Sequence, residues 1–121
     1  MGSVFLLCRL FGLDEAMTNS LLPKSVTTPI AVGISESHGG LVPVTVVAVI
    51  ITGIMGSILA PWLIRIFRVK DSMTAGLSIG ACSHAVGTSK AIELGETEGA
   101  MSGLAIGICG ILTVVFSLFL I

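Results

Sequence analysis

The sequence predicts an all-α, polytopic membrane protein with long transmembrane helices and two discontinuous, or broken, membrane segments. Hydrophobic residues make up 54% of the 121 residues and charged residues only 11%, whereas an ordinary soluble domain carries about 25% charged residues. No Asp, Glu, Lys or Arg occurs between Glu36 and Arg65, or after Glu98. Each uncharged stretch exceeds the roughly 20 apolar residues that cross the ~30 Å core of a bilayer. The composition therefore argues against a soluble globular fold, and a net charge of −1 gives no sign of nucleic-acid binding.

The first two apolar segments are short. Residues 4–13 predict a part-helix that stops at Gly12 and a polar turn formed by Asp14 and Glu15. Residues 25–38 would span only about 21 Å as one helix, at 1.5 Å per residue. Pro29 interrupts this segment, and a residue before proline prefers an extended conformation. We therefore expect residues 25–38 to form the first broken element.

The remaining segments alternate a long span with a polar one. Residues 41–67 are a long span in which Pro43 occupies the first turn, where its missing N–H costs little. Residues 74–94 are rich in glycine and hydroxyl side chains, and a second break is expected about midway, near His84. Residues 99–121 form the closing span, preceded by carboxylates that suit the start of a helix.

The basic residues predict the orientation. Arg65, Arg68 and Lys70 follow the long span directly, so this end should face the cytoplasm. If residues 25–38 and 74–94 both cross the bilayer, Lys24 lies inside and the loop at residues 93–98 lies outside. The alternative treats both broken segments as re-entrant hairpins. We favour the crossing arrangement, because re-entrant hairpins would be expected to divide the basic residues between the two sides.

A weak internal repeat accompanies these segments. Each hydroxyl-rich broken element precedes a long span that carries two glycines three positions apart, at Gly53 and Gly56 and again at Gly107 and Gly110. With both broken elements crossing, the two units would run in the same direction. An inverted repeat needs opposite directions, so its partner would have to lie outside this chain.

The polar residues at membrane depth predict a site for a small organic anion. Broken helices expose N-termini whose unpaired N–H groups and positive dipole attract anions. Hydroxyl groups would add donors, a lysine would offset the charge of a carboxylate, and a histidine could carry a coupled proton. The candidate substrate-binding residues are Ser25, Thr27, Thr28, Ser83, His84, Gly87, Thr88, Ser89 and Lys90.

Each of these residues also has a structural explanation. The hydroxyl groups can cap helices or bond to backbone carbonyls, His84 can join two helices by a hydrogen bond, and Lys90 can extend to the membrane interface. Cys8, Cys82 and Cys109 are interpreted as free thiols. A zinc site on Cys82 and His84 lacks further ligands, and no cofactor, metal or catalytic motif is predicted, so an enzyme is not expected.

Two phrases of the sequence resemble the LrgB/CidB family of bacterial membrane proteins. The first comprises Cys-Ser-His at residues 82–84, Gly-Thr at residues 87–88 and Glu-Leu-Gly-Glu-Thr-Glu-Gly-Ala at residues 93–100. The second is LPKSVTTPIA at residues 22–31. The family pattern has alanine where this chain has Cys82. Members are about twice as long, so residues 1–121 resemble a single membrane domain that is N-terminally truncated, equivalent to the C-terminal half.

The resemblance implies two functions. Plant relatives form the transport half of the plastid glycolate/glycerate translocator, which implies a transporter for glycolate, glycerate or pyruvate. Bacterial members are described as antiholin/holin-like regulators of murein hydrolase activity and cell lysis, often with a small LrgA/CidA-type membrane partner. It also implies a multi-pass protein of the bacterial cell membrane, with a homo-oligomer as a possible assembly. The two broken elements favour transport, because a simple pore former does not need them.

Overall fold

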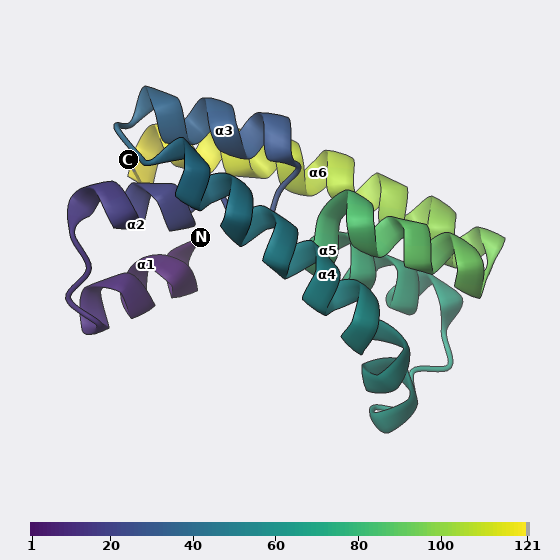
Figure 1. Ribbon diagram of the computed structural model, residues 1–121. Coiled ribbons are helices and arrows are strands. Elements are labelled where there is room, and N and C mark those ends of the chain that lie inside the picture. The colour runs from purple at the N-terminus through teal and green to yellow at the C-terminus, as the bar shows by residue number, and fades with distance from the viewer. Residues whose placement is uncertain (121) are drawn as a thin grey trace.

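The computed structural model describes residues 1–120, which form six α-helices and no strand (Figure 1). The helices are α1 (Gly2–Leu10), α2 (Glu15–Leu21), α3 (Thr28–Ser37), α4 (Val42–Ile66), α5 (Ser72–Leu94) and α6 (Glu96–Leu120). Two of them, α4 and α6, are long and apolar enough to cross a membrane, and most of their residues are not buried within the chain. The prediction of an all-helical membrane protein is confirmed, and residue 121 of the closing span lies outside the described part.

The helix α2 was not anticipated from the sequence. Asp14 and Glu15 were interpreted as a polar turn, but the Asp14 carboxylate accepts a hydrogen bond from the backbone N–H of Met17 at 3.1 Å. This contact caps a helix that begins at Glu15. The turn lies instead at residues 11–12, where Gly12 has a φ of +67° that suits glycine.

Residues 19–38, which comprise the end of α2, the connecting residues 22–27 and α3, form a re-entrant hairpin, which we call hairpin 1. Its two ends are bonded to each other: the side-chain amide of Asn19 donates to the carbonyl of His38 at 2.8 Å. The backbone N–H of Leu41 also donates to the Ser20 hydroxyl at 2.6 Å. The chain therefore enters and leaves at the same end of α4. The predicted crossing by residues 25–38 is wrong, because α3 has only 10 residues, about 15 Å of helix.

Helix α5 is a second re-entrant hairpin, hairpin 2, because it reverses direction at His84, where φ is 42° and ψ is −142°. Along its first half, Gly76 packs against Glu98 and Gly80 packs against Ser102, so this half runs parallel to α6. Along its second half, Thr88 bonds to Ser102 and Ile92 packs against Gly99. The second half therefore runs antiparallel to α6.

The halves of hairpin 2, residues 72–83 and 85–94, are about 18 Å and 15 Å long at 1.5 Å per residue. Each covers about half of a ~30 Å hydrocarbon core. The predicted break is confirmed, but the predicted crossing by residues 74–94 is wrong. A broken element does not have to cross the membrane, because its free backbone N–H and C=O groups can also be surrounded by protein when the chain turns back.

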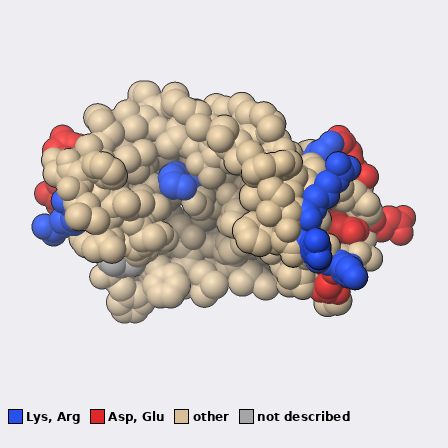
Figure 2. Space-filling model, turned by 90° about the horizontal axis from the view of Figure 1, so that it is seen from below, with Lys and Arg blue, Asp and Glu red and all other residues tan. Residues whose placement is uncertain are grey.

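Both loops that flank hairpin 2 lie at one end of the molecule. Lys70 and Asp71 line the same pocket as Leu94 and Glu98, although the sequence interpretation placed these loops on opposite sides. Charged side chains gather at the two ends in Figure 2, with one basic side chain between them beside a hollow. At the start of α5 the Thr74 hydroxyl and then its backbone N–H donate to Asp71, and these bonds lower the pKa of that carboxyl group.

The two units form an inverted repeat within this chain. Hairpin 1 enters from the end where α4 begins, and α4 then runs to the opposite end (Figure 1). Hairpin 2 enters from that opposite end, and α6 runs back alongside it. The second unit therefore repeats the first in the opposite direction, which corrects the expectation that both run the same way. Inverted units of this kind are typical of secondary transporters.

Candidate functional site

The tips of the two hairpins meet on α4. Val26, in the turn of hairpin 1, is buried against Val49, and the imidazole Nε2 of His84, at the tip of hairpin 2, lies 2.9 Å from the carbonyl oxygen of Val49. Helix α4 has 25 residues, about 37 Å in length, and Val49 lies about 10 Å from its start. Both tips are therefore at membrane depth, reached from opposite ends.

His84 combines an unusual backbone with a defined side-chain contact. It is one of two non-glycine residues with positive φ in the described chain, the other being Arg68. The residue as a whole is only 4% exposed. Because the Val49 carbonyl can only accept, Nε2 of His84 must carry the hydrogen. The bond between hairpin and helix that was considered as an alternative is present.

Glycines on α4 make room for this tip. A Cβ added to Gly53 would lie 2.6 Å from Cε1 of His84, and one added to Gly56 would overlap the Ser83 side chain. The Gly53/Gly56 pair therefore permits close contact between α4 and the tip of hairpin 2. Gly87 is needed for the same reason, because a Cβ there would overlap Ser83. The other pair differs: Gly110 faces Ile30 of α3, while Gly107 has no neighbour within 4 Å.

Thr88 joins hairpin 2 to α6. Its hydroxyl lies 2.7 Å from the hydroxyl of Ser102 and 3.0 Å from the carbonyl oxygen of His84. Ser102 is fully buried. The residues Ser83, His84, Gly87 and Thr88 are thus brought together around one kink, held against α4 on one side and α6 on the other.

The tip of hairpin 1 holds the other predicted hydroxyl groups. Thr27 is extended at φ −61° and ψ 146°, and its side chain makes no capping bond to α3, which begins at Thr28. Residues 22–26 form a tight turn, rather than the extended run expected before Pro29. Ser25 lines a cavity of about 460 Å³ that also contacts Ala81 of hairpin 2 and Cys109 and Thr113 of α6. This cavity brings residues of both tips together.

Ser89 and Lys90 lie away from the tips. They line a separate groove with Ser57 and Pro61 of α4, and the Lys90 ammonium pairs with Glu93 at 2.5 Å. The Ser89 hydroxyl bonds to the carbonyl of Ala85 at 3.4 Å. The structure thus keeps these two predicted residues apart from the others.

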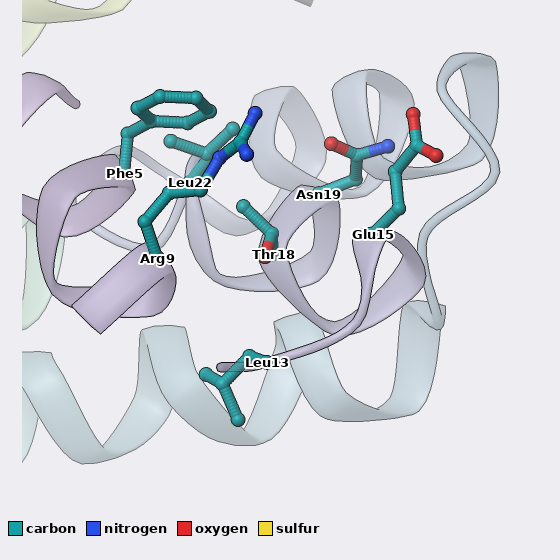
Figure 3. Close-up of a pocket in the computed structure, with 7 residues that line it drawn as sticks. All are labelled: Phe5, Arg9, Leu13, Glu15, Thr18, Asn19 and Leu22. Atoms are coloured by element: carbon teal, nitrogen blue, oxygen red, sulfur yellow. The ribbon is translucent and has the colours of Figure 1, made fainter. Parts of the chain in front are cut away.

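A further pocket, of about 420 Å³, opens between α1 and α2 (Figure 3). Its lining residues are Phe5, Arg9, Leu13, Glu15, Thr18, Asn19 and Leu22. The Arg9 guanidinium carbon lies 5.3 Å from the centre of the Phe5 ring. This pocket contains none of the predicted site residues, so it is distinct from the meeting point of the tips.

One residue of the tip was missed from the sequence. Lys24 was placed at the cytoplasmic surface, but it lies in the turn of hairpin 1, and its ammonium is 3.3 Å from the Ser25 hydroxyl. The signal was present, because Lys24 lies within the phrase LPKSVTTPIA. The expected crossing by residues 25–38 placed Lys24 at the membrane surface instead of at the tip of a hairpin. The three cysteines are free, as expected, but only Cys8 is buried.

Two long apolar helices that could cross a membrane, with two hairpins whose tips meet on α4, define an α-helical membrane protein. The LrgB-like family profile matches residues 1–121, and the chain belongs to this family. It is 42% identical over 112 residues to proteins named antiholin-like protein LrgB from Bacillus cereus (strain B4264) and Bacillus anthracis (strain CDC 684 / NRRL 3495). It is 41% identical over 112 residues to the protein YxaC of Bacillus subtilis (strain 168).

These matches cover 93% of the chain but 49% of each relative. The chain therefore spans about half the length of these relatives. No solved structure matches it.

Proposed function

We propose that this chain is part of a membrane transporter for small monocarboxylates of the glycolate, glycerate and pyruvate class. The observation that carries the proposal is the inverted pair of hairpins, whose tips meet on Val49. In inverted-repeat transporters the substrate site lies near the middle of the bilayer, at discontinuous helices. A regulator or a simple pore does not need this arrangement.

The chemistry of the tips favours an anion. Helix α3 begins at the tip of hairpin 1 with no side-chain cap, so its first N–H groups remain available to an acceptor. The hydroxyl groups of Ser25, Thr27 and Thr28 lie in the same turn or at its edge. The cavity of about 460 Å³ beside Ser25 falls in the range of small-molecule sites.

The test is uptake by vesicles that contain the chain, alone and with an LrgA/CidA-type partner. We expect saturable uptake of radiolabelled glycolate, with no leakage of an uncharged dye. Thr28→Val should raise the half-saturating concentration, because one hydrogen bond to a charged ligand contributes about 1.5–3 kcal/mol. Ser37→Ala, on the far end of the same helix, is the control. Unselective dye leakage would contradict the proposal.

The second candidate function is regulation of murein hydrolase activity and cell lysis, and the names of the antiholin-like relatives favour it. In that case the chain would act in the bacterial cell membrane through a small LrgA/CidA-type partner or as a homo-oligomer. Lysis would then depend on the chain while vesicles showed no saturable carboxylate uptake. Both candidates are membrane functions without a chemical reaction, so we do not propose an enzyme.

His84 is proposed as the carrier of a coupled proton. Its Nε2 is committed to Val49, which leaves Nδ1 to bind or release a proton. His84→Gln should flatten the pH dependence of uptake while keeping a donor toward Val49. An unchanged pH profile would limit His84 to holding the hairpin.

A further inference from the structure

Lys24 is the basic residue at the tip of hairpin 1. Its sequence neighbours Leu22 and Val26 are 2% and 4% exposed, and Val26 packs on Val49. Leu22 lines a pocket with Asn19 near the base of the hairpin, so the backbone of Lys24 lies between the base and the depth at which hairpin 2 reaches α4. A lysine at membrane depth is costly and usually marks a functional site.

The charge of Lys24 has no acidic partner in residues 1–120. The salt bridge found there joins Lys90 to Glu93, and the Lys24 ammonium bonds to the Ser25 hydroxyl instead. A hydroxyl group does not neutralise an ammonium ion, so the positive charge at this tip is left for a ligand.

The position of that charge fits an anion. Ser25, which accepts the bond from Lys24, lines the cavity shared with Ala81, Cys109 and Thr113. The Lys24 ammonium thus lies 3.3 Å from a hydroxyl group that lines the cavity, so it borders this space through Ser25. Charge-assisted hydrogen bonds to a carboxylate are about twice as strong as neutral ones.

We propose that Lys24 is the residue that binds the substrate carboxylate, at the cavity beside Ser25. Lys90, the lysine favoured by the sequence, does not serve this role, because Glu93 already neutralises it. This assignment rests on the proposed transport function and identifies the charged group of its site.

The first test compares two lysines in glycolate uptake by vesicles. Lys24→Gln should raise the half-saturating concentration roughly ten- to 150-fold, the effect of losing one hydrogen bond to a charged group. Lys24→Arg should retain uptake, and Lys90→Gln should match the wild-type chain. Unchanged uptake by Lys24→Gln, or a larger loss in Lys90→Gln, would overturn the assignment.

A second measurement does not depend on transport. In a Cys8→Ala, Cys82→Ser variant, Cys109 is the remaining thiol and lines the cavity. Glycolate should slow its reaction with N-ethylmaleimide, whereas ethylene glycol should not, and Lys24→Gln should remove the protection. If Cys109 does not react, Thr113→Cys on the same cavity takes its place.

The two measurements separate the possible failures. Protection without uptake would contradict the transport function and keep the Lys24 site. Uptake without a Lys24-dependent effect in either measurement would keep transport and overturn the site. Absence of both uptake and protection would overturn both proposals.

Discussion

His84 holds the tip of hairpin 2 in a conformation that favours glycine, at φ 42° and ψ −142°. A non-glycine residue in such a region costs on the order of 1–3 kcal/mol, and such residues persist where the surroundings fix them. Here the bond to Val49 and the space left by Gly53 fix the ring. The strained backbone of His84 is therefore held in place by the contacts of its own side chain.

This strain leads to the first prediction. His84→Ala loses the bond to Val49 and keeps the strain, whereas His84→Gly loses the bond but relieves the strain. We expect the glycine variant to be more stable than the alanine variant by about 1 kcal/mol, measured by thermal unfolding in detergent. An alanine variant as stable as the glycine variant would show that the backbone is relaxed at this position.

The second prediction concerns the glycines beneath the tip. Gly56→Ala and Gly87→Ala place a methyl group onto Ser83, and overpacking of this kind costs about 1–3 kcal/mol. The larger Gly87→Val should also abolish uptake while leaving membrane insertion intact. Gly107→Ala, with no neighbour within 4 Å, should be neutral or stabilising. Equal thermal stability for all three alanine variants would contradict the close contact.

At the scale of elements, both broken segments are too short to cross the bilayer, and each folds back as a hairpin. Hairpin 1 is closed at its base by buried hydroxyl groups. The Thr45 hydroxyl donates to the Ser20 carbonyl oxygen at 2.9 Å and lies 2.7 Å from the Ser35 hydroxyl. All three residues are fully buried. This cluster fixes the entry and exit of hairpin 1 against α4.

The third prediction tests the re-entrant arrangement. In a background without native cysteines, Arg68→Cys and Thr97→Cys should label from the same side of the membrane with an impermeant thiol reagent. These residues flank the two ends of hairpin 2. Glu36→Cys, at the base of hairpin 1, should label from the opposite side. Labelling of Arg68→Cys and Thr97→Cys from opposite sides would restore the crossing topology.

The sequence predicts the elements better than their directions. The long spans, Pro43 in the first turn of α4 and the break at His84 follow from local composition and spacing. The reversal of each hairpin depends on contacts between distant residues, such as Asn19 with His38, which local patterns do not show. The candidate site shows the same difference. The residues around the kink at His84 could be predicted from the sequence, whereas the position of Lys24 at the tip depends on the reversal of hairpin 1.

At the scale of the whole molecule, the inverted repeat determines how charge is distributed. Arg65, Arg68 and Lys70 stay at one end, with Lys90 on the hairpin that enters from that end. Arg9 and Lys24 belong to the opposite end, where α4 begins. The re-entrant arrangement therefore divides the basic residues, as expected for re-entrant hairpins, and leaves the larger group at the end with Arg65. Because more of the basic residues lie at this end, we still expect it to face the cytoplasm.

The fourth prediction tests the meeting of the two units. Ser25→Cys should be joined to native Cys109 by a short bifunctional thiol reagent, since both residues line one cavity. Ser57→Cys lines the groove with Lys90 and should not be joined to Cys109. Native Cys8 and Cys82 are replaced in both variants, and the readout is mass spectrometry of the linked peptides. Equal linkage of both pairs would contradict the separate positions of the cavity and the groove.

The re-entrant hairpins also impose an order on how the protein is made. Hairpin 1 precedes α4 along the chain and hairpin 2 precedes α6, so each hairpin leaves the ribosome before the long helix that follows it and packs against it. Irregular backbone is not tolerated in lipid until protein or water surrounds it. We therefore expect hairpin 1 to reach its depth together with α4, and hairpin 2, whose tip rests on α4, to complete its packing when α6 inserts. Insertion is thus expected to proceed in pairs, in which each hairpin completes its packing only when the long helix that follows it has inserted.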